Sequence, residues 1–270
     1  MPDLRTTVKH RSVSQLTTYA DCSERYRLER VQRAPQRPAA WSVQGTAFHA
    51  AIEAYERSGR TMAADDVRAV YVVTWQQEID KAYASEPNLN KWLRAGRTTT
   101  ERDIEARYAK GLNQVTDYIL FMADSPDDVA RLPDDSLAVE VPFRIHLGSV
   151  EIVGFIDQIV RDTTTGDLKV RDLKTGKEPV WPVQLGVYRI AMLEALGWDI
   201  PLGDYYLASG PKTTKPVDLR KHFGYEYVKG LFESLDNGIR AGSFIPNTSS
   251  CFTCSVKSSC KAYGVQFTKS

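Results

Sequence analysis

The stretch that decides the fold is VRDLKTGK, residues 170–177. Val170 and Leu173 indicate a buried strand, whereas Asp172 and Lys174, two positions apart, would point to the same face of that strand. Buried charges are costly unless they are paired or bound to a metal. Because an isolated Asp-x-Lys is usually a salt bridge on an edge strand, the meaning of this pair depends on the sequence around it.

The surrounding sequence predicts three consecutive strands, because apolar and polar residues alternate with a period of two over 136–147, 149–161 and 167–175. Short turns, each with a glycine, separate them. Asp157 lies in the second strand, in the apolar run VGFIDQIV. Since a short turn joins the second and third strands, they can pair as an antiparallel hairpin that brings Asp157 next to Asp172.

Helical spacing of apolar residues predicts helices on both sides of these strands. The expected helices lie at 12–33, 44–58, 61–84, 98–123, 181–197 and 218–241, with a further strand at 204–209. We therefore expect an α/β fold with a mixed central sheet flanked by helices. The 270 residues fit a single domain, with a helical insertion at 60–135 and a sheet core at 136–210.

The composition is that of a globular protein, with 42% hydrophobic and 26% charged residues. No apolar run is long enough to span a membrane. The first residues, MPDLRTTVKHRSVSQ, contain no apolar signal core, so a reducing cytoplasmic setting is expected.

Positive charge is concentrated at the two ends of the chain, although the net charge is only +1. Residues 1–37 carry eight Lys and Arg against four Asp and Glu, and residues 210–270 carry nine against four. The segment between them has a net charge of −8. A solvated surface has such a distribution by chance, and so does a polyanion track beside an acidic metal site.

Two adjacent carboxylates repel each other unless a divalent cation neutralises them. Oxygen-rich sites of this kind suit Mg²⁺ or Mn²⁺. Such a metal polarises a phosphoryl group and holds an attacking water. Lys174 would orient or deprotonate that water, or stabilise negative charge at the phosphorus.

Four motifs together resemble the RecB-type members of the PD-(D/E)xK nucleases. In chain order they are GTAFHAAIEAY (45–55), GFID (154–157), DLKTGK (172–177) and QLGVY (184–188). The resemblance implies metal ligation by His49, Asp157, Asp172 and the backbone carbonyl of Leu173. It implies a catalytic set of Asp157, Asp172, Lys174, Gln184 and Tyr188.

Three of these assignments have structural alternatives. Gln184 and Tyr188 lie one helical turn apart, so they either pack the helix onto the sheet or, as in the family, lie beside the DNA strand and the catalytic lysine. Glu53, one turn after His49, is either an outer acid of the site or a solvated glutamate. Glu140 alternates with Val139 and Val141, and we favour the polar side of an edge strand over the site.

The four cysteines form a metal-ligand pattern rather than a disulfide framework. They are Cys22, Cys251, Cys254 and Cys260. Four thiolates hold either zinc or an iron–sulfur cluster. One distant N-terminal cysteine followed by three near the C-terminus resembles the iron–sulfur staple of AddB-type nucleases and of the RecB-type CRISPR adaptation nucleases. The resemblance implies a [4Fe-4S] cluster in a staple region of residues 1–37 and 242–270.

Basic and aromatic residues near this staple are candidates for nucleic-acid contacts. Arg25, Arg27, Arg30 and Arg33 would contact phosphates, and Lys177 would touch the backbone. Between the expected helices at 61–84 and 98–123, a loop with Lys91, Trp92, Arg94 and Arg97 suits base stacking together with contacts to the DNA backbone. A solvated helix face and a tryptophan that anchors the insertion are the structural alternatives.

The motifs thus predict a metal-dependent DNA nuclease. The family resemblance implies an exonuclease that acts on single-stranded ends in recombination, repair or phage DNA metabolism. No G-x-x-x-x-G-K-[ST] helicase motif is present, so unwinding would need a helicase or recombination partner; an oligomer is compatible with the sequence. The alternatives are an end-processing subunit of a CRISPR adaptation or recombination complex, and a non-catalytic DNA-binding iron–sulfur module.

Overall fold

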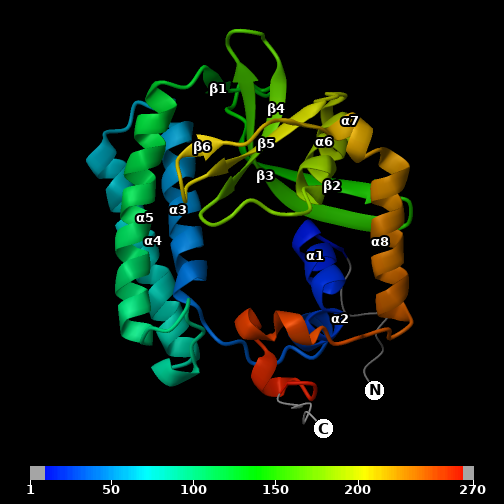
Figure 1. Cartoon of the computed structure of the whole chain (residues 1–270). Coiled ribbons are helices and arrows are strands. Elements are labelled where there is room, and N and C mark those ends of the chain that lie inside the picture. Colours follow the sequence, from blue (N-terminus) through cyan, green and yellow to red (C-terminus); the bar gives the residue numbers. More distant parts are fainter. Residues whose placement is uncertain (1–9, 264–270) are drawn as a thin grey trace.

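A seven-stranded mixed sheet forms the centre of the structure, a computed structural model that describes residues 10–263 (Figure 1). The hydrogen-bonded order is β1-β3-β4-β5-β6, with β2 also paired to β3 and β7 to β5. The strands are β1 (Asp127–Val129), β2 (Val139–Leu147), β3 (Val150–Asp162), β4 (Leu168–Lys174), β5 (Leu202–Leu207), β6 (Lys212–Thr213) and β7 (Val217–Asp218).

The strands β2, β3 and β4 form the expected antiparallel meander. Gly148 allows the tight turn between β2 and β3, because its φ of +60° lies in the left-handed region. The long strand β3 pairs with β2 along its first part and with β1 and β4 near its end. The strand β5 then runs parallel to β4, so the sheet is mixed, as the sequence predicts.

Helices cover both faces of the sheet, and a separate hydrophobic core lies on each side of it. One core lies between the sheet and α1 (Val13–Asp21), α6 (Val183–Leu196) and α8 (Tyr225–Arg240). The other lies among α3 (Ala40–Arg57), α4 (Ala64–Ser85) and α5 (Thr100–Ala123), and it includes Leu173 and Tyr206 of the sheet. Because both of its faces are covered, β4 is buried along most of its length.

Two expected helices are interrupted. The segment 12–33 is divided at Cys22, whose backbone is extended (φ −157°), into α1, α2 (Ser23–Tyr26) and a π-helical turn η1 (Arg27–Val31). The segment 218–241 is divided at Phe223 and Gly224 into α7 (Leu219–His222) and α8. The expected insertion at 60–135 also contains β1, which pairs with β3, so its helical part ends with α5.

The segment around α2 and the segment that follows α8 lie side by side (Figure 1). The carbonyl of Ile245 accepts a hydrogen bond from Ser23 Oγ at 3.1 Å, and the Asn247 amide donates to the Asp21 carbonyl at 2.8 Å. Further along, the Arg37 amide donates to the Ser255 carbonyl at 2.8 Å. Three short 3-10 helices complete the structure. They are η2 (Leu89–Lys91), η3 (Thr248–Thr253) and η4 (Lys257–Ser259).

Among the described residues, no helix combines the length and the apolar character needed to cross a membrane.

Candidate active site

The β3–β4 hairpin brings two acids together inside the sheet. The ladder runs from Arg161–Leu168 to Gln158–Arg171, and Asp157 and Asp172 occupy the next position. The amide of Leu173 donates a hydrogen bond to Asp157 Oδ2 at 2.8 Å. Both acids are buried, so their charges interact strongly.

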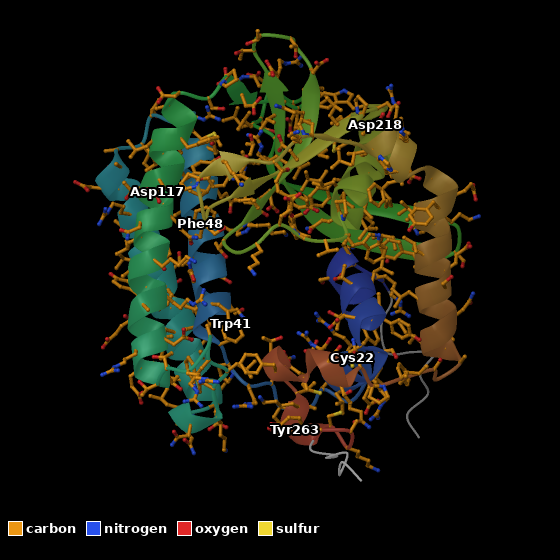
Figure 2. The ribbon with its side chains drawn as sticks, in the orientation of Figure 1. Cys22, Trp41, Phe48, Asp117, Asp218 and Tyr263 are labelled. Atoms are coloured by element: carbon orange, nitrogen blue, oxygen red, sulfur yellow. The ribbon has the colours of Figure 1, made fainter. Side chains whose placement is uncertain are left out.

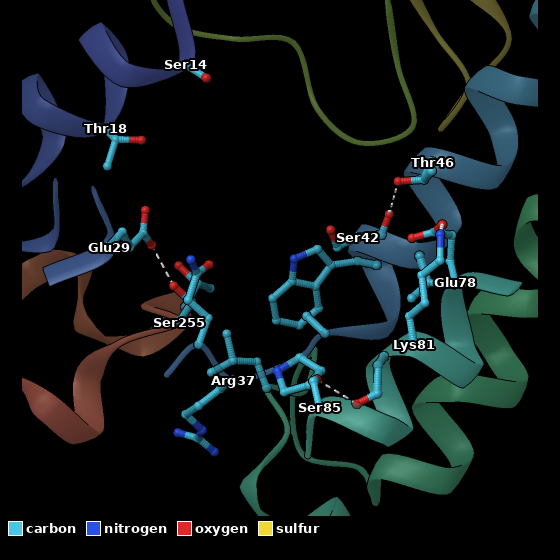
Figure 3. Close-up of a pocket in the computed structure, with 18 of the residues that line it drawn as sticks. Ser14, Thr18, Glu29, Arg37, Ser42, Thr46, Glu78, Lys81, Ser85 and Ser255 are labelled. Carbon is cyan, nitrogen blue, oxygen red and sulfur yellow. Dashed lines mark hydrogen bonds and ion pairs between the residues drawn. The ribbon is translucent and has the colours of Figure 1, made fainter. Parts of the chain in front are cut away.

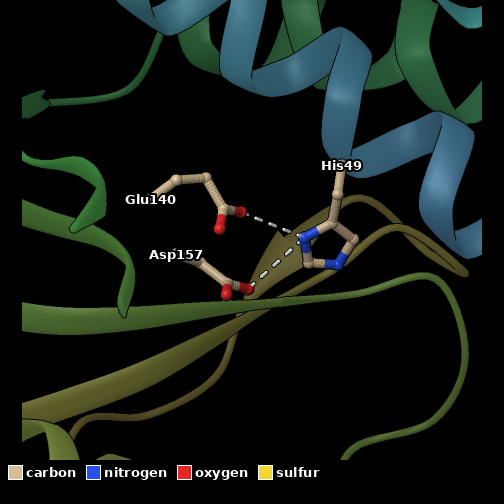
Figure 4. Close-up of side chains that lie close together, drawn as sticks. All are labelled: His49, Glu140 and Asp157. Atoms are coloured by element: carbon tan, nitrogen blue, oxygen red, sulfur yellow. Dashed lines mark ion pairs between the residues drawn. The ribbon is translucent and has the colours of Figure 1, made fainter. Parts of the chain in front are cut away.

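His49 of α3 and Glu140 of β2 join Asp157 from two other elements (Figure 4). His49 Nδ1 lies 3.6 Å from Asp157 Oδ2 and 3.7 Å from Glu140 Oε1. One potential ligand atom from each residue falls within 4.8 Å of the others. The opposite ring nitrogen, Nε2, lies 3.1 Å from the carbonyl oxygen of Leu173, so the histidine bridges the acids and the β4 backbone.

The position of Glu140 corrects the interpretation that it lies on the polar side of an edge strand. Its φ of +47° is left-handed, which is unusual for a non-glycine residue inside a strand. The ladder pairs Val139 with Gln158 and Val141 with Ile156, so Glu140 falls opposite Asp157. The sequence contains a signal for this position. The turn at residues 147–149 fixes the register of β2 on β3, and that register places Glu140 opposite Asp157.

A second network joins Asp172 to α6. Lys174 Nζ lies 2.5 Å from Asp172 Oδ2 and donates to Gln184 Oε1 at 3.2 Å. The Gln184 amide donates to the Tyr188 hydroxyl at 2.6 Å, and that hydroxyl donates to Asp172 Oδ1 at 3.3 Å. Gln184 and Tyr188 occupy one face of α6, one turn apart. These four side chains therefore form a closed ring of contacts that fixes the ammonium group of Lys174.

Burial and mutual repulsion shift the titration of the site. Burial, and then the charge of Asp172, raise the pKa of Asp157 to about 7. Burial alone would lower the pKa of His49, but Glu140, Asp157 and Asp172 together raise it. Burial and the nearby acids raise the pKa of Tyr188 well above 10, so its hydroxyl remains a hydrogen-bond donor.

The donor set fits a hard divalent cation. It combines one imidazole nitrogen with the carboxylates of Glu140 and Asp157, which is chemistry that suits Mg²⁺ or Mn²⁺. Asp172 Oδ2 is buried and close to Lys174, yet it accepts no hydrogen bond of favourable geometry. Two adjacent buried carboxylates, Asp157 and Asp172, repel each other, and a bound cation would relieve that repulsion.

Glu53 does not reach this group. Its carboxylate accepts from Arg57 Nε at 2.8 Å, at the surface of α3. Glu53 is therefore a surface glutamate rather than an outer acid of the site.

All four cysteines line one cavity between α2 and the C-terminal segment, with Arg25 and Asn247 among the other lining residues. None of them forms a disulfide. The amides of Arg25 and Asn247 donate to Cys22 Sγ at 3.4 and 3.3 Å. Burial and the neighbouring Cys260 and Cys22 raise the pKa of Cys251.

The expected base-stacking role of Trp92 is wrong. Its side chain is 1% exposed, its indole N–H donates to the Glu86 carbonyl at 2.8 Å, and its ring packs against Tyr83. Trp92 therefore anchors the insertion, and no base can reach its ring.

The other expected DNA contacts differ in their surroundings. Arg25 pairs with Glu29 at 2.7 Å and Arg27 with Glu24 at 2.6 Å, within one helical segment. Arg30 and Lys177 are exposed and form no ion pair within residues 10–263. Arg33, Arg94 and Arg97 are likewise exposed and form no ion pair among the described residues, so these five side chains present a cationic group to a phosphate.

Two phage proteins and one solved structure are similar to this chain. The Gene 69 protein of Mycobacterium phage D29 is 35% identical over 263 residues, covering 94% of this chain and 97% of its own length. The Gene 69 protein of Mycobacterium phage L5 is 33% identical over 292 residues, covering 97% of this chain and 100% of its own length. The crystal structure of SSO0001 aligns with 93% of this chain and 95% of its own, at 13% identity and a TM-score of 0.35, too weak a likeness for argument.

One family model spans nearly all of the described residues. It is that of the PD-(D/E)XK nuclease superfamily, and it matches residues 10–261, which include the helix of His49, the acidic hairpin with Lys174, and the cysteines at both ends. Because the match covers the mixed sheet as well as the residues that meet on it, the chain belongs to the PD-(D/E)XK nuclease superfamily.

Proposed function

We propose that this protein is a divalent-metal-dependent deoxyribonuclease that hydrolyses phosphodiester bonds at the ends of single-stranded DNA. The observation that carries the proposal is the meeting of His49, Glu140 and Asp157 beside the Asp172–Lys174 pair. A metal-binding set next to a fixed ammonium group is what phosphodiester hydrolysis needs.

A bound Mg²⁺ or Mn²⁺ would supply Lewis-acid polarisation of the scissile phosphoryl group. His49, Glu140, Asp157 and Asp172 would hold it, with the carbonyl of Leu173 as a further proposed ligand. The backbone amide of Leu173 already holds Asp157 in place at 2.8 Å. The ligands come from β2, β3, β4 and α3, so a rigid sheet and a long helix define their geometry.

Lys174 would act on the attacking water and on the charge that develops at the phosphorus. Its side chain is 28% exposed, and its ammonium group is held from two sides, by Asp172 and by Gln184. An ammonium group whose position is fixed before the reaction stabilises developing negative charge without reorganisation. Gln184 and Tyr188 are therefore positioning residues for Lys174 and Asp172.

A preference for free single-stranded ends is supported by a cavity that we call the central cleft. It has a volume of about 580 Å³. Ser14, Thr18, Glu29 and Ser255 line one side of it, and residues of α3 and α4 line the other (Figure 3). Residues 36–39 of the connection between η1 and α3 also line it, so the chain itself passes along one side.

Further contacts join the segments around the central cleft. The Arg11 amide donates to the Glu151 carbonyl at 2.7 Å, which joins the start of α1 to the sheet. Arg37 Nη2 donates to the carbonyl of Trp92 at 3.1 Å, which joins the connection that lines the cleft to the insertion. If these segments surround a bound strand, it would have to enter by a free end, as an exonuclease requires.

We propose that the cysteine cavity holds a [4Fe-4S] cluster. All four cysteines line this cavity and none of them forms a disulfide, so four thiolates are available to bind a cluster. The same four thiolates would also suit zinc, and metal analysis distinguishes the two.

The phage origin of both similar proteins supports a role in phage DNA recombination, repair or replication. Because the chain has no nucleotide-binding helicase motif, duplex substrates would need a helicase or recombination partner to supply a single strand.

The proposal is tested with end-labelled DNA and anaerobically purified protein. We expect Mn²⁺- or Mg²⁺-dependent release of short products from linear single strands, slower release from blunt duplexes, and no cleavage of circular single strands. The position of the label that is released first gives the polarity. Cleavage of circular strands as fast as linear ones would contradict the requirement for an end, and an absence of cleavage under all conditions would contradict the nuclease activity.

The cluster is tested by iron, sulfide and zinc analysis of the same preparation. We expect about four irons per chain and a brown colour that fades in air. Cys22→Ala removes the ligand that joins the two ends, so it should lower the iron content and the melting temperature. A colourless protein with one zinc and full stability would contradict the assignment.

A further inference from the structure

Trp41, Gly45 and His49 lie on successive turns of one face of α3. We propose that Trp41 is a base-stacking residue that positions a single DNA strand in the central cleft, with Arg30 and Arg37 as its phosphate contacts. The inference rests on the proposed function, because it names how that function would hold its substrate.

The packing of Trp41 differs from that of the other tryptophans. Trp75 and Trp92 are buried, and Trp181 and Trp198 pack against the sheet core. Trp41 is half-buried, belongs to no hydrophobic cluster of the described residues, and lines the central cleft. Figure 2 labels it near the N-terminal end of α3, on the side of the C-terminal segment. A large aromatic surface facing a polar cleft serves binding better than folding.

The charge of the central cleft suits a polyanion. Its acidic lining residues are Glu29 and Glu78, and each already pairs with a cation that lines the same cleft, Arg25 and Lys81. Arg30 and Arg37 also line it, and within residues 10–263 neither forms an ion pair. The cleft therefore has two uncompensated positive charges beside an exposed indole face, the combination that holds single strands.

A smaller basic pocket continues the central cleft toward the surface. The two share Arg37 and Leu93. The smaller pocket also contains Arg94, Lys257 and Phe252, and Phe252 is 69% exposed.

Gly45 leaves space on the face of α3 between Trp41 and His49. A Cβ added at Gly45 would meet only Thr175 Oγ1, at 3.9 Å. Trp41 and His49 are eight positions apart, which is about 12 Å along the helix. That length corresponds to roughly three or four nucleotides stacked at 3.4 Å each. A base stacked on Trp41 would thus set the register of the strand at the scissile phosphate.

The test is binding of oligothymidylate in EDTA, where no cleavage occurs. Tryptophan quenching is measured with the unlabelled strand, and Kd is measured from the anisotropy of a dye-labelled strand. Trp41→Ala should raise Kd by about 5- to 150-fold, the equivalent of the 1–3 kcal/mol of one stacked base. Trp41→Phe keeps an aromatic face, so it should bind within about threefold of the wild type while the fluorescence quenching disappears. Trp198→Phe, a control away from the cleft, should leave the quenching intact.

An abasic strand of equal length separates stacking from charge. It should bind the wild type and Trp41→Ala equally, because only bases stack. Equal oligothymidylate Kd values for wild type and Trp41→Ala, or full quenching in Trp41→Phe, would overturn the inference. These outcomes are independent of nuclease activity, because a protein that never cleaves but shows Trp41-dependent binding contradicts only the proposed function.

Discussion

Glu140 and Asp157 face each other at the one position of the β2–β3 ladder, between Val139 and Leu147, where the two strands are not paired. Glu140 adopts a left-handed backbone there, with φ +47°. Both acids lie within 3.7 Å of His49 Nδ1. Strain of this kind costs about 1–3 kcal/mol and persists where function needs it, which agrees with a metal-binding role for Glu140.

The strain and the ligand role of Glu140 can be separated by two substitutions. Glu140→Gly and Glu140→Ala both remove the carboxylate, so both should lower Mn²⁺ affinity at least tenfold. Only glycine adopts a left-handed backbone without cost, so Glu140→Gly should unfold with a free energy about 1 kcal/mol above that of Glu140→Ala. Calorimetric titration and chemical denaturation measure the two effects. Wild-type affinity in either variant would argue against ligation.

Metal binding should depend steeply on pH below neutrality. The pKa of Asp157 is raised to about 7, so below pH 7 this carboxyl holds a proton that the metal must displace. The raised pKa of His49 acts in the same direction. The Mn²⁺ association constant should therefore fall at least tenfold per pH unit from 7 to 5 and level off above 8. Titration in buffers of different ionisation enthalpy counts the released protons, and a flat profile would contradict the coupling.

The same shift makes the metal-free protein less stable at higher pH. An acid whose folded pKa exceeds its unfolded value stabilises the folded state while it is protonated. This stability is lost as the pH rises from the unfolded pKa of about 4 through the folded pKa of about 7, and it changes no further above that. Asp157→Asn removes the titrating group, so its melting temperature in EDTA should change less than that of the wild type between pH 5 and 8. An identical pH dependence of the melting temperature in both proteins would show that Asp157 is not the group that causes it.

The buried cations behind the site should be essential for stability. Arg171 is 0% exposed and pairs with Asp204 at 2.7 Å and with Asp127. Arg171→Met leaves two buried carboxylates without that partner, and we expect a loss of about 3–5 kcal/mol in unfolding free energy. Arg144→Met breaks the exposed pair with Glu151 and should cost no more than about 1 kcal/mol. Similar losses in both variants would contradict this account.

The ring of contacts on α6 predicts a rate effect without a binding effect. Gln184→Leu removes one of the two partners of Lys174, and a misplaced ammonium group should lower the single-turnover rate roughly 10- to 100-fold. Binding of single strands in EDTA should stay unchanged. Gln76→Leu, on the exposed face of α4, serves as the matched control. A wild-type single-turnover rate in Gln184→Leu would contradict the proposal that Gln184 positions Lys174.

Local patterns in the sequence predict much of the fold. The period-two alternation gives the meander, and the short turn after β3 explains why Asp157 and Asp172 meet. The apolar spacing does not indicate the break at Cys22, because this spacing continues from α1 into α2. The break depends instead on the cysteine sulfur, which caps the start of α2.

Tertiary packing decides what the sequence leaves open. Nothing local distinguishes Trp92, which is buried under the insertion, from Trp41, which lines the central cleft. The buried pairing of Lys169 and Arg171 with Asp127 and Asp204 joins β1, β4 and β5. Its members come from three separate segments, so no periodicity or motif indicates it.

The most direct test of the central claim is the single-turnover cleavage of end-labelled linear single-stranded DNA in Mn²⁺ by wild type, Asp172→Asn and Lys174→Ala. Lys215→Ala, an exposed lysine beyond β6, is the matched control. We predict metal-dependent cleavage by the wild type and the control, and a loss of at least about 100-fold in the two site variants. Cleavage by Asp172→Asn or Lys174→Ala at the wild-type rate would contradict the assignment of the active site.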